Sequence, residues 1–469
     1  MEPWYDAIDN FMSFPILVIV LAASGLFFTI RTRGVQIRQF LTACKLIVEK
    51  PESSQKVSSF QALMVSTASR VGTGNIIGVS TALCIGGPGA CFWMWLMCVI
   101  GASSAFVEST LAQIYKQKGK DGSFFGGPAY YIEKALKLPV ISVIFCIFLI
   151  ATYAGGFNLL ASFNVQDSFR AYDFYDSTWT PVIVGGVLAV LVGVCLLGGG
   201  KSIVKLTEKL VPAMGIAYVL VSLVIIFTHV QNIPDSFARI FENAFDFPAI
   251  FGGVTGSCMV LGIKRGLFSN EAGVGSAPNA SASADVTHPV KQGLVQTVSV
   301  YIDTLLLCTA TALMCLVSGV DRGVGVMGAT YVQNAVSTVF GDFGPVFITI
   351  ALSLFAFTTL IGNLYYVENA LAYLNKKRIP SRRFMTVFYI CCVAVIFVGA
   401  LAEMDMAWAF ADITMYCLAL INIPCCIILS GIAVKALKDF ESQKKRKLNP
   451  VFRARNIGLD ETTLQHWKD

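Results

Sequence analysis

The chain has 469 residues, of which 55% are hydrophobic and only 14% are charged, and its mean hydropathy is +0.68. Soluble domains carry about 25% charged residues, so the composition excludes a soluble globular protein and indicates one embedded in a lipid bilayer. The formal net charge of +6 does not indicate a nucleic-acid partner, because the basic residues gather in loops between alternate apolar segments.

The first apolar segment, "SFPILVIVLAASGLFFTI" from Ser13 to Ile30, follows an acidic N-terminus. A secretory signal would begin with positive charge, so this segment is predicted to stay in the protein as a leading helix. Ten further segments follow, each long enough to cross a hydrocarbon core of about 30 Å. They are predicted at 60–86, 88–115, 139–168, 181–198, 206–229, 249–282, 290–317, 344–374, 384–401 and 407–434. The expected fold class is an all-α polytopic membrane protein with about 11 transmembrane helices in a single domain, residues 1–469.

The loops predict the orientation. Most of the 35 Lys and Arg residues fall in loops 31–59, 116–138, 199–205, 283–289 and 375–383 and in a basic tail at 435–469. Because cytoplasmic loops carry an excess of Lys and Arg, the N-terminus is predicted outside and the C-terminus in the cytoplasm. The protein is expected in the plasma (inner) membrane, with the tail as a solvated basic strand attracted to anionic lipid.

The second segment contains "SRVGTGNIIG", from Ser69 to Gly78. Glycine costs a helix interior about 1 kcal/mol relative to alanine, and an arginine near the bilayer centre costs roughly 2.5–3.5 kcal/mol. A plain spanning helix gains nothing from these residues. Unwinding, in contrast, frees backbone groups that must line a cavity or bind a ligand. The free N–H groups of a helix N-terminus suit a carboxylate, and free carbonyls at a helix C-terminus suit a hard cation.

A similar interruption, "GIKRGLFSNEAGVGSAP" from Gly262 to Pro278, lies in the seventh segment. The ten segments therefore divide into two sets of five, 60–229 and 249–434, and each set opens with a broken helix. Because each set has an odd number of spans, the two sets must run in opposite orientations. Paired interrupted segments at matching positions indicate the midplane binding site of a transporter.

Cysteine and histidine offer no competing chemistry. The 14 cysteines lie mostly in apolar stretches without metal-ligand spacing, which is typical of buried, reduced thiols. With only three histidines and no nucleophile motif, an enzyme is not expected. A channel is disfavoured as well, because the two halves are unlike and show no ring of repeated charges.

Several motifs follow one another across most of the chain: "ASRVGTGNIIG", "GGPGACFWMW", "FVESTLAQIYK", "GGPAYYIEKAL" and "GLFSNEAGVGSAPNASA". In these motifs the sequence resembles the alanine or glycine:cation symporter family. The resemblance implies a LeuT-type fold, in which a leading helix precedes two inverted five-helix repeats with discontinuous core helices 1 and 6. It also implies symport of a small neutral amino acid with Na⁺ as the coupling ion.

The resemblance further implies a set of site residues. The N–H groups of Thr73 and Gly74 would receive the substrate carboxylate, and Asn75 would be a substrate or sodium ligand. Sodium would be held by the carbonyls of Ala68 and Val71 and the hydroxyls of Thr358 and Thr359, consistent with the preference of hard cations for oxygen. The other implied substrate contacts are Gln166 in core helix 3 and Phe268, Ser269 and Asn270 in core helix 6.

One position departs from the family pattern. Some members carry tryptophan after the glycine of the eighth-helix motif, where this chain has Asn363 in "LIGNLYY". A smaller, polar residue would leave room and a hydrogen-bond partner for a longer side chain. Serine, asparagine and especially glutamine are therefore expected as substrates beside alanine and glycine.

The residues also leave alternatives open. The glycines could form a helix-packing face, Thr358 and Thr359 could bond within their own helix, and Gln166 could face water. Proton coupling through Glu271 or Glu108 is the alternative mechanism. Arg70 is expected to pair with a carboxylate such as Glu271 or Glu108, or else to extend into the inner vestibule. Lys264 and Arg265 are expected in a hydrated cavity beside the second break, and Asp303, Glu368 and Asp412 have no assigned role. The oligomeric state does not follow from the sequence, with which a monomer is compatible.

Overall fold

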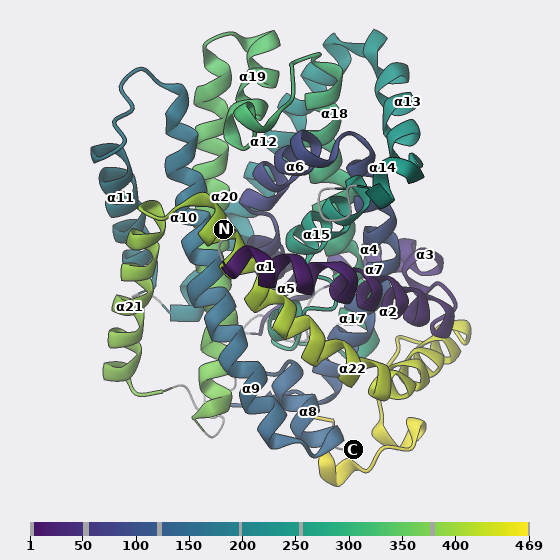
Figure 1. The fold of residues 1–469 in the computed structure, drawn as a ribbon. Helices are drawn as coiled ribbons and strands as arrows, with labels where there is room; N and C mark the ends of the chain where they lie inside the picture. Colours follow the sequence, from purple (N-terminus) through teal and green to yellow (C-terminus); the bar gives the residue numbers. More distant parts are fainter. Residues whose placement is uncertain are drawn as a thin grey trace.

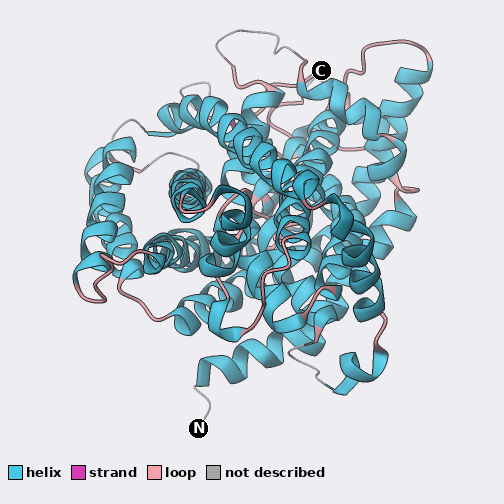
Figure 2. Cartoon of the chain, turned by 90° about the horizontal axis from the view of Figure 1, so that it is seen from above, coloured by secondary structure: helices cyan, strands magenta, loops and turns pink. Residues whose placement is uncertain are grey.

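The computed structural model describes residues 4–49, 56–119, 124–196, 199–252, 257–375 and 380–467. Helices make up nearly all of this part of the chain (Figures 1 and 2). The helices are α1 Trp4–Phe11, α2 Val18–Arg31, α3 Val35–Arg38, α4 Phe40–Ile47, α5 Ser59–Arg70, α6 Ile77–Thr81, α7 Gly89–Ile114, α8 Pro128–Leu136, α9 Pro139–Ile150, α10 Phe157–Asp167 and α11 Trp179–Leu196. They continue with α12 Gly199–Thr228, α13 Ile233–Ala244, α14 Phe247–Gly252, α15 Cys258–Asn270, α16 Ala277–Ser281, α17 Pro289–Tyr301, α18 Thr309–Val317, α19 Ala329–Phe340, α20 Phe343–Leu374, α21 Arg382–Ala400 and α22 Met404–Lys445. Two short strands, β1 Gln117–Lys118 and β2 Phe124–Phe125, pair antiparallel.

Nine helical stretches in the described part of the chain are long and apolar enough to cross a membrane. They are Trp4–Arg31, Gly89–Ile114, Pro139–Ala171, Trp179–Leu196, Ser202–Thr228, Pro289–Val317, Phe343–Leu374, Arg382–Ala400 and Met404–Lys445. The prediction of an all-α polytopic membrane protein is confirmed. The other two predicted spans, 60–86 and 249–282, are the segments that contain the breaks, so the total of eleven and the inverted repeat stay predictions.

The broken helices lie at the centre of the bundle. In Figure 1, α5 and α15 occupy the middle of the molecule, with α6 above them. Helix α5 packs against α12 and α20, and α15 packs against α7. The backbone irregularities are therefore surrounded by protein, which satisfies the requirement that non-helical backbone at membrane depth not face lipid.

The C-terminal tail differs from its prediction. Helix α22 continues to Lys445 instead of ending near residue 434, and the residues beyond it pack against the bundle. Trp467 Nε1 donates to the Gln113 carbonyl at 2.8 Å, and Thr287 Oγ1 donates to the Pro450 carbonyl at 2.7 Å. The tail is packed because it carries apolar residues among the basic ones, and Phe452, Ala454, Ile457, Leu464 and Trp467 are all buried.

The packed tail helps to enclose Lys116, which follows α7. The Lys116 ammonium donates to the Ala284 carbonyl at 2.9 Å and lies 4.3 Å from the centre of the Phe124 ring and 5.2 Å from that of Trp467. Burial lowers the pKa of Lys116 to about 7, partly offset by Asp285 and reinforced by Lys56. The folded protein therefore disfavours the charged form of this side chain.

This burial predicts a pH-dependent stability. Burying a charged Lys116 lowers the free energy of unfolding. This destabilisation has its full size below pH 7 and disappears as the pH rises towards the ordinary lysine pKa of about 10.4. We expect the melting temperature of the wild type, measured against Lys116→Met in detergent, to rise by about 2 °C or more between pH 7 and pH 9.5. The exposed neighbour Lys118 serves as a control, since Lys118→Met removes a lysine without relieving any burial. An equal difference between wild type and Lys116→Met at both pH values would contradict the prediction.

Candidate functional site

The first break lies between α5 and α6. Helix α5 ends at Arg70, Gly72 is extended, and a short 3-10 turn at Thr73–Asn75 precedes α6. Asn75 Oδ1 accepts a hydrogen bond from the Gly72 N–H at 2.9 Å and so satisfies one of the freed backbone groups. Thr73 and Gly74 begin the 3-10 turn, a position where N–H groups lack a partner within the helix.

Two glycines let this break approach its neighbours. A Cβ added to Gly72 would collide with the Thr359 hydroxyl of α20, and one added to Gly74 would lie 3.0 Å from the Phe268 ring of α15. The glycines are thus required by close packing between three helices. The alternative of a plain helix-packing face does not apply, because the backbone is not helical at Gly72.

The second break lies between α15 and α16. Helix α15 ends at Asn270, and Glu271 adopts a left-handed backbone with φ 52° and ψ 22°. The chain turns further at Gly273 and Gly275, both with positive φ, before α16 begins. Asn270 Oδ1 accepts from the Ala272 N–H at 3.0 Å, so an asparagine side chain closes this break as well.

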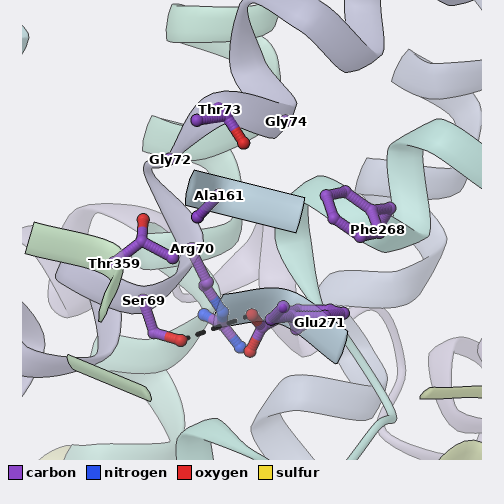
Figure 3. A pocket seen from close by; sticks show the side chains of 10 residues that line it. Ser69, Arg70, Gly72, Thr73, Gly74, Ala161, Phe268, Glu271 and Thr359 are labelled. Atoms are coloured by element: carbon purple, nitrogen blue, oxygen red, sulfur yellow. Dashed lines mark hydrogen bonds between the residues drawn. The ribbon is translucent and has the colours of Figure 1, made fainter. Parts of the chain in front are cut away.

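A small pocket of about 10 Å³ lies between the two breaks, space for about one water molecule (Figure 3). Its lining comes from α5 and the break after it, and from α10, α15 and α20. The lining residues are Ser69, Arg70, Gly72, Thr73, Gly74, Phe157, Ala161, Phe268, Glu271 and Thr359.

Of the predicted substrate contacts, Thr73, Gly74 and Phe268 line this pocket. Gln166 is not in its lining, and its Oε1 accepts from the Tyr175 hydroxyl at 3.2 Å. Asn363 is also outside the lining, directly behind Ser69, which donates to Asn363 Oδ1 at 2.6 Å. Asn363 Nδ2 in turn donates to Asn158 Oδ1 at 3.0 Å, so the contact of Asn363 with the pocket runs through Ser69.

Asn75, Ser269 and Asn270 bond to neighbours outside the pocket lining. Asn75 Nδ2 donates to Asp303 Oδ1 at 2.7 Å, and Ser269 Oγ donates to Asp303 Oδ2 at 2.8 Å. Asn270 Nδ2 donates to the Thr304 hydroxyl at 3.2 Å. Asp303, in the π-helical segment Ile302–Cys308, is thus a buried junction between residues next to both breaks, and sequence reasoning had noted it only as an unassigned acid.

The predicted sodium ligands are partly brought together. Thr359 Oγ1 lies 3.2 Å from the Ala68 carbonyl, with Val71 following at the end of α5. Thr358 Oγ1 instead donates within its own helix, to the Phe355 carbonyl at 2.9 Å and the Leu354 carbonyl at 3.1 Å, and lies 3.6 Å from Met214 Sδ. The structure places one of the two hydroxyls beside the expected carbonyl.

Arg70 and Glu271 line the pocket, although neither was among the predicted contacts. Both are almost completely buried, with exposed fractions of 2% and 1%, and Figure 3 shows their side chains next to each other. A third buried acid, Glu108, accepts from Asn422 Nδ2 at 2.8 Å and from the Gly273 N–H at 3.3 Å. An arginine and a glutamate within apolar segments were the signal available in the sequence.

A buried ionic cluster lies on the far side of Phe268. Lys264 of α15 pairs with Asp9 of α1 at 2.5 Å and with Asp412 of α22 at 3.1 Å. Arg265 also pairs with Asp412, at 3.1 Å, and lies 3.7 Å from the centre of the Trp408 ring. The Trp408 ring is 4.9 Å from that of Phe268, so an aromatic pair connects the cluster to the pocket.

Comparison with known proteins places the sequence of this chain in a family. Residues 1–454 match the model of the sodium:alanine symporter family. The chain is similar to the amino-acid carrier protein AlsT of Bacillus subtilis, with 39% identity over 475 residues that cover 100% of this chain and 99% of the relative. It is 39% identical to the probable sodium/glutamine symporter GlnT of B. subtilis, covering 93% and 90%. A putative sodium/proton-dependent alanine carrier protein, YrbD of B. subtilis, is 40% identical, covering 95% and 94%.

The contact between Gly72 and Thr359 yields a stability prediction. Gly72→Ala is expected to lower the melting temperature in detergent, because overpacking costs about 1–3 kcal/mol, and adding Thr359→Ala should recover most of the loss. Gly78→Ala is the matched control, since a Cβ there would meet its nearest neighbour only at 3.9 Å. The proposed contact would be refuted by a Gly72→Ala melting temperature equal to that of the wild type, or by a double variant no more stable than the single one.

Proposed function

Because the chain belongs to the sodium:alanine symporter family, we propose that it is a sodium-coupled symporter importing small neutral amino acids by alternating access. The observation that carries the proposal is the pocket between the two helix breaks, lined by Thr73, Gly74 and Phe268. N–H groups at the start of the 3-10 turn would hold the substrate carboxylate. Asn75, Gln166, Ser269, Asn270 and Asn363 are proposed to take part after rearrangement around the pocket.

Sodium would bind where α5 ends against α20. The Ala68 carbonyl and the Thr359 hydroxyl already lie 3.2 Å apart, and the Val71 carbonyl and a rotated Thr358 hydroxyl would complete the set. Asn75 is the proposed link between the ion and the substrate. Entry of one sodium ion yields about 2.3 kcal/mol per 100 mV, and a tenfold gradient adds about 1.4 kcal/mol. Together these terms sustain an accumulation of a few hundredfold.

The proposal includes the architecture. We infer eleven spans, with the leading helix followed by inverted repeats at 60–229 and 249–434 in a LeuT-type arrangement. The N-terminus lies outside and the C-terminus in the cytoplasm of the plasma (inner) membrane. The support is the match between the predicted spans and the helices, together with a break near the start of each repeat.

A second candidate is proton coupling. It is favoured by Glu108 and Glu271, two fully buried carboxyl groups next to the breaks, and a relative is named for dependence on both sodium and protons. In this version one of the two glutamates would carry the proton, and Arg70 would stand in for the cation.

The test of coupling is uptake by proteoliposomes containing the purified protein. Labelled alanine, glycine, serine and glutamine are offered with an inward sodium gradient, or with choline in its place at the same pH. Sodium is expected to stimulate uptake of at least one of them by about tenfold or more, because the ion gradient supplies the driving force. Uptake of every substrate at the same rate in choline would reject sodium coupling, and stimulation by an inward proton gradient would support the second candidate.

Position 363 tests the substrate range. Asn363→Trp is expected to abolish glutamine uptake while alanine uptake stays within about threefold, because the larger ring would press on Ser69 and narrow the pocket. Asn363→Ser is the control, since it keeps a hydroxyl that can donate and accept, and it should transport both. Equal loss of both substrates in a monodisperse Asn363→Trp protein would discard the argument from size.

A further inference from the structure

Glu271 has an unusual backbone for a side chain of its kind. Its φ of 52° places it in the left-handed region, which non-glycine residues seldom occupy and which is typical of strained functional positions. The residue ends α15, where its N–H donates to the Leu267 carbonyl at 2.8 Å, and its side chain lines the pocket. The strained backbone of Glu271 thus brings a carboxylate to the pocket.

The two carboxylate oxygens of Glu271 are held differently. Oε2 accepts from Ser276 Oγ at 2.5 Å, whereas Oε1 is 3.5 Å from Ser69 Oγ, another lining residue. The short hydrogen bond fixes the carboxylate in position. The loosely held oxygen retains the capacity to accept a strong, charge-assisted hydrogen bond.

Arg70 does not form an ion pair with Glu271 Oε1. Its Nη1 donates to Gln296 Oε1 at 3.4 Å, and its Nε and Nη2 have no hydrogen-bond partner among the residues that the structure describes. It attracts the carboxylates of Glu108, Glu271 and Asp303 from a distance. One guanidinium thus acts on three carboxylates. The acidic groups next to the pocket therefore outnumber the basic one.

We propose that Glu271 receives the ammonium group of the substrate while the N–H groups at Thr73 and Gly74 receive its carboxylate. The inference rests on the proposed function and deepens it, since it assigns the two charged groups of an α-amino acid to opposite walls of the pocket. Figure 3 shows this opposition, with Thr73 and Gly74 on one side and Glu271 on the other. The ammonium group would raise the number of positive charges next to the three acids Glu108, Glu271 and Asp303 from one to two.

The assignment makes the amino group a condition of binding. An α-hydroxy acid of the same size, such as lactate beside alanine, has no positive charge and leaves the buried Glu271 carboxylate without a cationic partner. Sites built around a buried polar group reject a ligand that cannot pair with it far more strongly than they reject a change in size. An ester of alanine should fail for the opposite reason, because it lacks the carboxylate.

The test is binding of labelled alanine to the purified protein with sodium, with lactate and alanine methyl ester as competitors. The wild type should bind alanine at least about 100-fold more tightly than lactate. Glu271→Gln should weaken alanine about tenfold or more and reduce the preference over lactate to a few fold, and Glu271→Asp should retain part of it. Glu368→Gln is the matched control, since Glu368 is an acid within another apolar helix that accepts from the Tyr389 hydroxyl and does not line the pocket, and the preference of this variant for alanine should persist.

Four results would overturn the proposal. The first is that lactate competes as well as alanine for binding to the wild type. The second is that a monodisperse Glu271→Gln protein keeps the wild-type preference for alanine over lactate. The third is that Glu271→Gln weakens the binding of glutamine and leaves the binding of alanine unchanged, which would place Glu271 against the substrate side chain instead. Binding of alanine that is selective but independent of sodium would reject the proposed coupling and leave the role of Glu271 standing. The fourth is that the purified protein binds no amino acid, which would reject both the proposed function and the role of Glu271.

Discussion

The close packing of the first unwound segment against helix α15, inside an apolar bundle, is the constraint on which the rest of the structure depends. Peptide groups freed by a break must be satisfied by protein, and here an asparagine does this at each break, Asn75 for Gly72 and Asn270 for Ala272. The first break can approach α15 only because Gly74 leaves room for the Phe268 ring. Gly72, Thr73 and Gly74 line the pocket, so the unwound backbone faces a cavity within the protein and not lipid.

The sequence was sufficient for the features that the bilayer itself determines. Helix length follows from the thickness of the hydrocarbon core, which is why the predicted span 139–168 matches the helical stretch Pro139–Ala171 and 344–374 matches Phe343–Leu374. The breaks could be located as well, since glycines next to polar residues have no role in a lipid-facing helix. Helix α5 ends at Arg70, just before the "GTGN" motif, and α15 ends at Asn270 within "FSNEAG".

Side-chain partners could not be predicted in the same way, because they depend on contacts between segments far apart in the chain. Asn75 and Ser269 were assigned to the substrate, yet both donate to Asp303, more than thirty residues from either. Thr358 and Thr359 are adjacent in sequence, but the helix directs one hydroxyl to its own backbone and the other to Ala68. The tail was taken as solvated because its charges are conspicuous, whereas Phe452 and Trp467 decide its packing.

The ionic cluster behind Phe268 connects the site to helix α1, which lies outside the two proposed repeats. Two bases of α15, Lys264 and Arg265, face two acids, Asp9 of α1 and Asp412 of α22. Buried charges are tolerated when paired, and separating them costs several kcal/mol. A movement of α15 away from α22 would break these pairs and the contact of Trp408 with Phe268 together. Because α15 also ends at Glu271, the cluster resists the displacement that would open this side of the pocket, and the N-terminal helix contributes to that resistance through Asp9.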